Sequence, residues 1–101
     1  MSTVPDIGRQ EDTDVAVLER PDQPHDVVLW NDDVNLMATV IHALKRLFSY
    51  PTEKAEQLTL QVHNNGKAVV WSGARDRCVA YVQALHGYGL QATVGKSGGD
   101  L

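Results

Sequence analysis

The chain has 101 residues, of which 43% are hydrophobic, so it can form one small domain with a buried core. This length excludes a multidomain enzyme and a doubly wound nucleotide-binding fold. The lone cysteine, Cys78, excludes a disulfide framework and a four-ligand zinc knuckle, and it fits a reducing compartment. The sequence has neither an apolar run of membrane-spanning length nor a recognisable signal peptide, so we expect no membrane segment.

The net charge of −4 is concentrated in residues 1–24, which contain six acidic and two basic residues. Residues 25–101 contain seven of each sign and are neutral overall. Because residues 25–101 are neutral overall and contain no stripe of basic residues, nucleic acid is not expected as a partner. Prolines interrupt residues 1–24, and their polar composition predicts a flexible acidic extension that contributes nothing to the core.

The first predicted elements are a strand and a helix. Residues 27–30 are rich in β-branched and aromatic side chains and predict a strand that is buried on both faces or nearly so. Residues 31–33 predict a turn, and Asn35 is a candidate N-cap for the helix that follows. Apolar residues recur at helical spacing over residues 36–48, which is the clearest amphipathic helix in the sequence.

A second helix is predicted to open at residues 50–53 and to stop at residues 64–66, where Asn and Gly accept the left-handed conformation. A strand is predicted at 68–71. Ser72 and Gly73 are candidates to cap a third helix, which residues 87–89 interrupt, and residues 90–94 predict a last strand. The order β-α-α-β-α-β predicts a two-layer α+β domain with a three-stranded antiparallel sheet packed on three helices.

Asn31, Asp32 and Asp33 lie between the first predicted strand and the first predicted helix. On spacing alone, two carboxylates at this place could simply cap the helix and complement its dipole. An amide with two ionised carboxylates also suits a cation that presents several N–H donors, such as a primary ammonium.

The other chemical groups give little indication of catalysis. His63, near the end of the second predicted helix, is either a partner of the helix dipole or a functional group. Cys78 falls on the apolar stripe of the third predicted helix, which favours a structural thiol. Asp32, Asp33 and His63 match no standard metal spacing, and the sequence contains no phosphate loop or hydrolase elbow. We therefore expect no enzyme activity, no metal and no cofactor.

If the first two helices pack side by side, the start of the first meets the end of the second. Met37, Val40 and Val62 would then line a small apolar pocket, with Asn31, Asp33 and His63 at its rim. The alternative, which the pattern alone favours, is that these apolar residues belong to an ordinary core.

Three segments resemble the ClpS family, the N-degron adaptors of bacterial Clp proteases. These are Leu-Trp-Asn-Asp-Asp at 29–33, Met37, and Leu-Gln-Val-His-Asn-Asn-Gly-Lys-Ala-Val at 60–69. The resemblance extends over residues 26–94. The Val-His-x-x-Gly-Lys-Ala segment is highly specific, and its interval from the upstream Asn-Asp-Asp makes chance agreement improbable.

The resemblance implies an adaptor domain over residues 25–96 and a flexible end at 97–101. Proteins of this family bind substrates that begin with Leu, Phe, Tyr or Trp. They deliver these substrates to the N-terminal domain of an Hsp100 unfoldase, ClpA or ClpC, which feeds the ClpP peptidase. The family's flexible N-terminal extension engages the unfoldase during this hand-over. Residues 1–24 are expected to do so here, with a passive solubilising tail as the alternative.

The resemblance also implies a cytoplasmic protein of bacteria, or of an organelle of bacterial descent, and we expect a monomer. By position, the amine-binding group would be Asn31, Asp33 and His63, together with Asp32, which would help to shape the loop. Met37 would gate the pocket, whose lining would comprise Asn35, Leu36, Val40, Thr59, Val62 and Leu90.

Two departures from the family pattern concern the pocket. Many members have Thr-Pro where Asn35 and Leu36 stand, and a hydrophobic residue, often Met, where Thr59 stands. Thr59 is smaller and polar, so the pocket floor is expected to be wider or to offer a hydroxyl. The alternative function is a same-fold interaction module that modulates a Clp unfoldase without binding N-degrons, and such a module would not need an amine-binding group.

Overall fold

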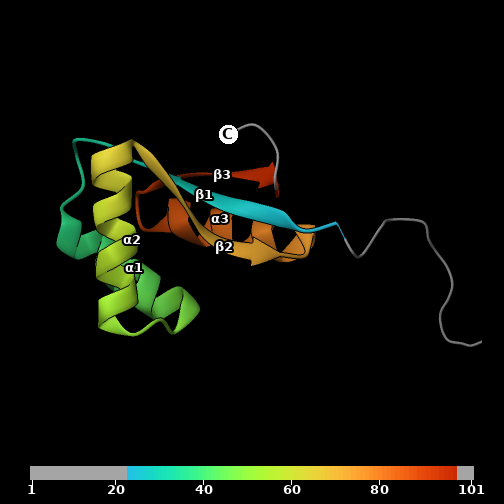
Figure 1. The fold of residues 1–101 in the computed structure, drawn as a ribbon, viewed down its shortest axis with the longest axis horizontal. Coiled ribbons are helices and arrows are strands. Elements are labelled where there is room, and N and C mark those ends of the chain that lie inside the picture. The colour runs from blue at the N-terminus through green and yellow to red at the C-terminus, as the bar shows by residue number, and fades with distance from the viewer. Residues whose placement is uncertain (1–22, 98–101) are drawn as a thin grey trace, which may run out of the picture.

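The computed structural model describes residues 23–97. The predicted acidic extension therefore lies almost entirely outside the described residues, as does most of the predicted flexible end. The elements are β1 (His25–Trp30), α1 (Met37–Phe48), α2 (Thr52–Asn65), β2 (Lys67–Gly73), α3 (Arg75–Gly87) and β3 (Gln91–Lys96) (Figure 1). This order confirms the predicted β-α-α-β-α-β arrangement. None of the helices in the described part is long and apolar enough to cross a membrane.

The sheet has the order β2-β1-β3, and both pairings are antiparallel. The central strand β1 is buried at Val27, Val28 and Leu29, although successive side chains point to opposite faces. This confirms the prediction of a strand buried on both faces. Val70 is an extra residue in β2, because Val27 pairs with Trp71 while Val28 pairs with Val69.

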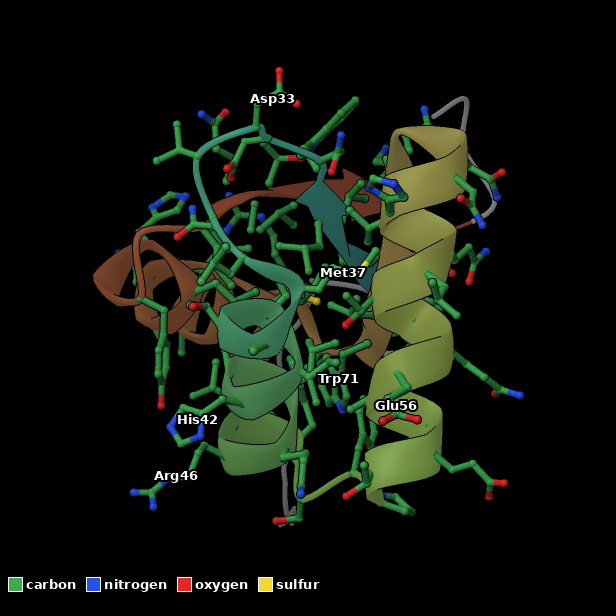
Figure 2. All side chains as sticks on the ribbon, turned by 90° about the vertical axis from the view of Figure 1, so that its left-hand side faces the viewer. Asp33, Met37, His42, Arg46, Glu56 and Trp71 are labelled. Atoms are coloured by element: carbon green, nitrogen blue, oxygen red, sulfur yellow. The ribbon has the colours of Figure 1, made fainter. Side chains whose placement is uncertain are left out.

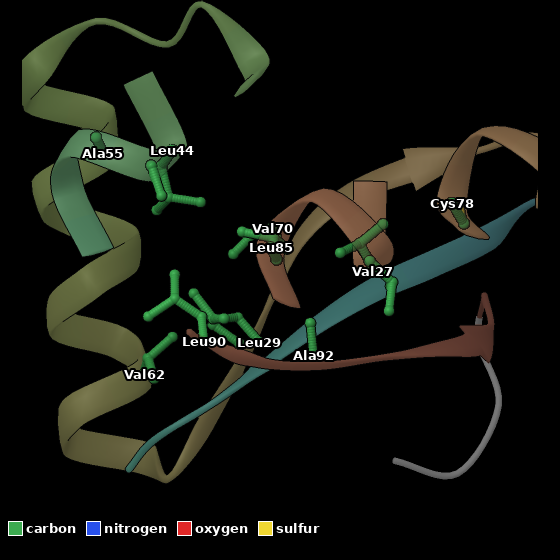
Figure 3. Packing of buried hydrophobic residues seen from close by; sticks show 13 residues of the cluster. Val27, Leu29, Leu44, Ala55, Val62, Val70, Cys78, Leu85, Leu90 and Ala92 are labelled. Carbon is green, nitrogen blue, oxygen red and sulfur yellow. The ribbon is translucent and has the colours of Figure 1, made fainter. Parts of the chain in front are cut away.

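The helices pack against the sheet in two groups. Helix α3 packs against all three strands, and α1 and α2 lie against each other at one end of the sheet (Figure 1). Leu44 of α1 and Ala55 of α2 are fully buried. At the sheet end that faces α1 and α2, Leu29, Val62 and Leu90 lie close together in the core (Figure 3).

Glycine ends α2 as the sequence predicts. Gly66 has φ of 89°, and its backbone N–H donates to the carbonyl of Val62. Helix α1 ends in the same backbone conformation without a glycine, since Ser49 has φ of 57° and donates its N–H to the carbonyl of Lys45. The short turn between α1 and α2 reverses the chain and places the start of α1 beside the end of α2, which is the arrangement that a pocket between them requires.

Two predicted caps are wrong. Helix α1 begins one residue later than a cap at Asn35 requires, because Leu36 is the N-cap and makes no side-chain cap bond. The Asn35 amide instead donates to the carbonyl of Gly89. Ser72 and Gly73 belong to β2 and do not cap α3, whose N-cap is Ala74. The Ser72 hydroxyl donates to the buried carboxylate of Asp26, on the neighbouring strand.

Candidate functional site

A cavity of about 270 Å³ lies between the end of β1, the loop that follows it, α1 and α2. Its wall contains all eleven residues that the sequence predicts for the site, from the loop, from both helices and from the turn before β3. Two further residues of β1, Leu29 and Trp30, complete it. The lining residues are Leu29, Trp30, Asn31, Asp32, Asp33, Asn35, Leu36, Met37, Val40, Thr59, Val62, His63 and Leu90.

Asp32 holds the loop between β1 and α1 in shape. One of its carboxylate oxygens accepts the backbone N–H of Val34 at 2.9 Å and that of Asn35 at 2.8 Å. Both oxygens also lie 3.2 Å from the side-chain amide nitrogen of Asn35, which donates to the Gly89 carbonyl at 2.8 Å. These donors, above all the Asn35 backbone N–H, lower the pKa of the Asp32 carboxyl below its ordinary value of 3.8. The carboxylate therefore ties the loop to itself and, through Asn35, to the turn before β3.

Asn31 is fixed next to the C-terminus of α2 by its backbone. Its N–H donates to the carbonyl of Gly66 at 2.9 Å, and Gly66 is the residue that ends α2. His63 lies in the last turn of the same helix. This bond between main chains brings the Asn31 side chain and the imidazole of His63 to the same rim of the cavity.

The polar groups at the rim are exposed and available. Asn31, Asp33 and His63 are all exposed, and within residues 23–97 their side chains make no hydrogen bond with the protein. Asp33 stands at the outer tip of the loop, whereas Met37 points between α1 and α2 (Figure 2). The two neighbouring carboxylates therefore differ in their contacts, since Asp32 accepts hydrogen bonds from the loop and Asp33 faces solvent.

The electrostatics of this rim favour a cation. The C-terminal end of a helix carries partial negative charge, and the α2 C-terminus lies here together with the Asp33 carboxylate. A carboxylate, an amide oxygen and a neutral imidazole can all accept hydrogen bonds. The rim is therefore suited to a small cation with several N–H donors.

The interior of the cavity is mostly apolar. Leu29, Val62 and Leu90 are at most 4% exposed, and Val40 is half-buried. Met37 is 39% exposed and stands at the opening. A cavity with an apolar interior and polar groups at one rim fits a ligand that is charged at one end and hydrophobic at the other.

Sequence reasoning missed Trp30. This residue is 39% exposed, and its Nε1–H donates to the hydroxyl of Thr93 on β3 at 2.9 Å. The ammonium of Lys67 lies 5.1 Å from the ring centroid, which is a cation–π distance. Its position directly before Asn31 is the available signal, but only the folded structure shows that the end of β1 borders the cavity.

Cys78 does not take part in this site. It is fully buried on α3, and burial raises the pKa of its thiol above the ordinary value of 9.0. A buried thiol with a raised pKa is a poor nucleophile at neutral pH.

The family model and the similar proteins all point to one protein family. The model of the family described as "ATP-dependent Clp protease adaptor protein ClpS" matches residues 20–93. An ATP-dependent Clp protease adapter protein ClpS from Nocardia farcinica is 50% identical over 78 residues, which cover 77% of this chain and 74% of the relative. The protein of the same name from Rhodococcus jostii is 42% identical over 98 residues, which cover 97% of this chain and 88% of the relative.

A solved structure agrees with the fold. The structure of Agrobacterium tumefaciens ClpS2 bound to L-phenylalaninamide superposes with a TM-score of 0.69 at 26% sequence identity, and the match covers 76% of this chain and 99% of that one. Both the matched residues and the arrangement of the elements agree with the resemblance of the motifs around Asn31 and His63. The chain belongs to the ClpS family of ATP-dependent Clp protease adaptor proteins.

Proposed function

We propose that the protein binds substrates that begin with Leu, Phe, Tyr or Trp and delivers them to a Clp Hsp100 unfoldase for degradation. The observation that carries this proposal is the cavity itself. Three exposed acceptor side chains, which form no hydrogen bond with residues 23–97, stand at its rim, and an apolar interior lies behind them; they are Asn31, Asp33 and His63. A free N-terminal residue has the same two parts, an ammonium group and a hydrophobic side chain.

The ammonium group accounts for the recognition of a chain terminus. It presents three N–H donors and a positive charge, which match the Asp33 carboxylate, the Asn31 amide oxygen and a neutral His63 imidazole. Each charge-assisted hydrogen bond contributes about 1.5–3 kcal/mol. In this proposal Asp32 acts through the loop, because one of its oxygens accepts the backbone N–H groups of Val34 and Asn35.

The interior accounts for the preference for bulky residues. Full burial of a Leu or Phe side chain contributes about 1.5–3 kcal/mol. Met37 stands at the opening, where a side chain that branches at Cβ would meet it. We therefore expect Val and Ile to be rejected by shape.

The ligand of the structural relative supports the proposal. L-phenylalaninamide, to which Agrobacterium tumefaciens ClpS2 is bound, combines a free α-amino group with a phenyl side chain. In this chain, the ligand would place its amine at Asn31, Asp33 and His63 and its ring against Met37, Val40, Val62 and Leu90. For the hand-over we propose ClpA or ClpC, together with ClpP, as the partner and residues 1–24 as the segment that engages the unfoldase.

Fluorescent peptides that differ only at their N-terminus test this function. A peptide that begins with Phe is expected to bind at least about tenfold more tightly than its N-acetylated form, since one lost charge-assisted bond corresponds to about that factor. Peptides that begin with Leu, Tyr or Trp are expected to bind and those with Val or Ala to bind poorly. Fluorescence anisotropy measures all of these affinities. Equal affinity for the free and the acetylated Phe peptide would contradict the amine-binding role and favour an interaction module that does not bind N-degrons.

His63→Ala and His42→Ala form a matched pair for the same assay. His63 lines the cavity, whereas His42 is exposed on α1 outside it and contacts the edge of Tyr88. His63→Ala is expected to weaken the Phe peptide about tenfold, while His42→Ala leaves its affinity unchanged. If both variants bind like the wild type, His63 does not hold the amine.

A further inference from the structure

Thr59 is the buried polar side chain of the cavity. It is 3% exposed, and it lines the cavity from α2. Within the described part of the chain, Asp26 is the other buried polar residue, and it lies on β1 outside the cavity, paired with Ser72. The buried apolar residues Leu29, Val62 and Leu90 line the same cavity.

The Thr59 hydroxyl can offer a ligand only an acceptor. Its Oγ1 donates to the backbone carbonyl of Ala55 at 2.7 Å, one turn earlier in α2. A hydroxyl has one hydrogen and two lone pairs. The bond to Ala55 uses the hydrogen, so only the lone pairs can accept a hydrogen bond from a ligand. In apolar surroundings, such an acceptor gains from a ligand N–H or O–H but not from an alkyl or phenyl group.

We propose that Thr59 is a specificity determinant that favours N-terminal Trp and Tyr over Leu and Phe. This inference rests on the proposed function, in which the N-terminal side chain enters the cavity. Of the four bulky residues, only Trp and Tyr carry a donor, the indole N–H or the phenol O–H, far from the α-amino group. With the ammonium group at Asn31, Asp33 and His63, this distal donor pairs with Thr59 Oγ1 at the floor.

Thr59→Val tests the hydrogen bond, because it replaces the hydroxyl by a methyl group of similar size. The probe pair is a peptide that begins with Trp and one that begins with benzothienylalanine, in which sulfur replaces the indole N–H. Wild-type protein is expected to bind the Trp peptide about 2- to 12-fold more tightly, the value of one neutral hydrogen bond. In Thr59→Val this ratio is expected to fall to about one, and the ratio of Tyr to Phe affinity is expected to fall in parallel.

Two control variants distinguish the hydroxyl from other effects. Thr59→Ser keeps the hydroxyl and is expected to retain a preference for Trp over benzothienylalanine. Thr52→Val makes the same chemical change at an exposed position at the start of α2 and is expected to leave the ratio at its wild-type value.

The outcomes separate this inference from the proposed function. If wild-type protein binds free Phe peptides better than acetylated ones but binds Trp and benzothienylalanine equally, the inference is overturned and the function stands. An unchanged ratio in Thr59→Val overturns it as well. If no free-amine peptide binds better than its acetylated form, the function fails and the inference fails with it. The comparison of the two peptides on wild-type protein decides the matter even if Thr59→Val does not fold.

Discussion

Asp32 and Asp33 are adjacent carboxylates with different surroundings. Asp32 accepts two backbone N–H groups and the Asn35 side-chain amide, whereas Asp33 is exposed at the tip of the same loop. A carboxylate that accepts backbone N–H groups stabilises the loop conformation as long as it is ionised. The amine-binding geometry therefore depends on Asp32 even though Asp33 makes the contact in the proposed function.

The pKa of Asp32 gives a testable pH dependence. Its folded value lies below 3.8, so the carboxylate stabilises the loop at every pH above that value and this contribution is lost as the pH falls through the lowered pKa. The side-chain carboxyl resonance of Asp32 in an NMR titration is expected to have its midpoint below 3.8. Asp32→Asn is expected to speed hydrogen exchange at the amides of Val34 and Asn35 at neutral pH, because an amide oxygen is a weaker acceptor than a carboxylate.

Asp76→Asn is the matched control for this change. Asp76 lies in the exposed first turn of α3, away from the loop, so its substitution is expected to leave exchange at Val34 and Asn35 unaltered. A midpoint at or above 3.8, or loop exchange in Asp32→Asn equal to that of the wild type, would show that Asp32 does not hold the loop.

At the scale of the elements, the end of α2 organises the site. Gly66 ends this helix in the left-handed region, and its carbonyl accepts the N–H of Asn31. No described atom lies within 4 Å of the position of a Cβ at Gly66, so only the backbone conformation requires glycine there. The same residue thus ends the helix that carries His63 and holds the residue that begins the loop.

Gly66→Ala is expected to lower the free energy of unfolding by about 1–2 kcal/mol, since an L-residue with a side chain is strained at φ of 89°. Urea denaturation followed by circular dichroism measures this change. Gly87→Ala is the matched control, because Gly87 also has no neighbour within 4 Å of a Cβ but lies in α3 without a positive φ. Alanine is expected to be neutral or stabilising by up to about 1 kcal/mol there. Equal effects of the two substitutions would contradict the role of the φ angle.

Local patterns predict the elements of this fold better than their caps. The spacing over residues 36–48 and the stop at Gly66 are local signals, and both helices form where they indicate. Asn35 has the composition of an N-cap, but its amide bonds to Gly89, which is 54 residues away in the sequence. Ser72 pairs with Asp26 across two strands, which the sequence of one segment cannot show.

For the site, the family resemblance names the side chains that line the cavity and expects Asp32 to shape the loop, but it does not show the hydrogen bonds that hold them. The motifs around Asn31 and His63 point to the end of the sheet where the cavity lies, because both lie at the ends of predicted elements. Trp30 escapes prediction because its place at the rim depends on the pairing of β1 with β3, including the bond to Thr93. The Thr59 hydroxyl donates its hydrogen to the Ala55 carbonyl in one side-chain rotamer, and the residue type alone does not specify that rotamer.

At the scale of the whole molecule, the cavity is a product of the complete domain. Its wall combines the end of β1, the start of α1, the end of α2 and Leu90 after α3, so no pair of neighbouring elements could form it. The aromatic rings of Phe48, Tyr50, Trp71 and Tyr81 contact one another at the other ends of α1 and α2 and link these helices to β2 and α3. Among residues 23–97, those that line the cavity all lie between Leu29 and Leu90.

Deletion of residues 1–22 is therefore expected to separate binding from delivery. The deleted segment contains six acidic and two basic residues, and Pro24, whose carbonyl accepts the N–H of Ser97, is retained. The affinity for a peptide that begins with Phe is expected to stay within about twofold of the wild type. Degradation of a reporter with an N-terminal Phe by ClpAP or ClpCP is expected to slow strongly, because the proposed function assigns engagement of the unfoldase to this segment. A variant with a Gly/Ser segment of equal length tests whether length alone suffices, since up to about 75 Å of reach is restored without the charges. Delivery by the truncated protein at the wild-type rate would show that residues 1–22 are a passive tail.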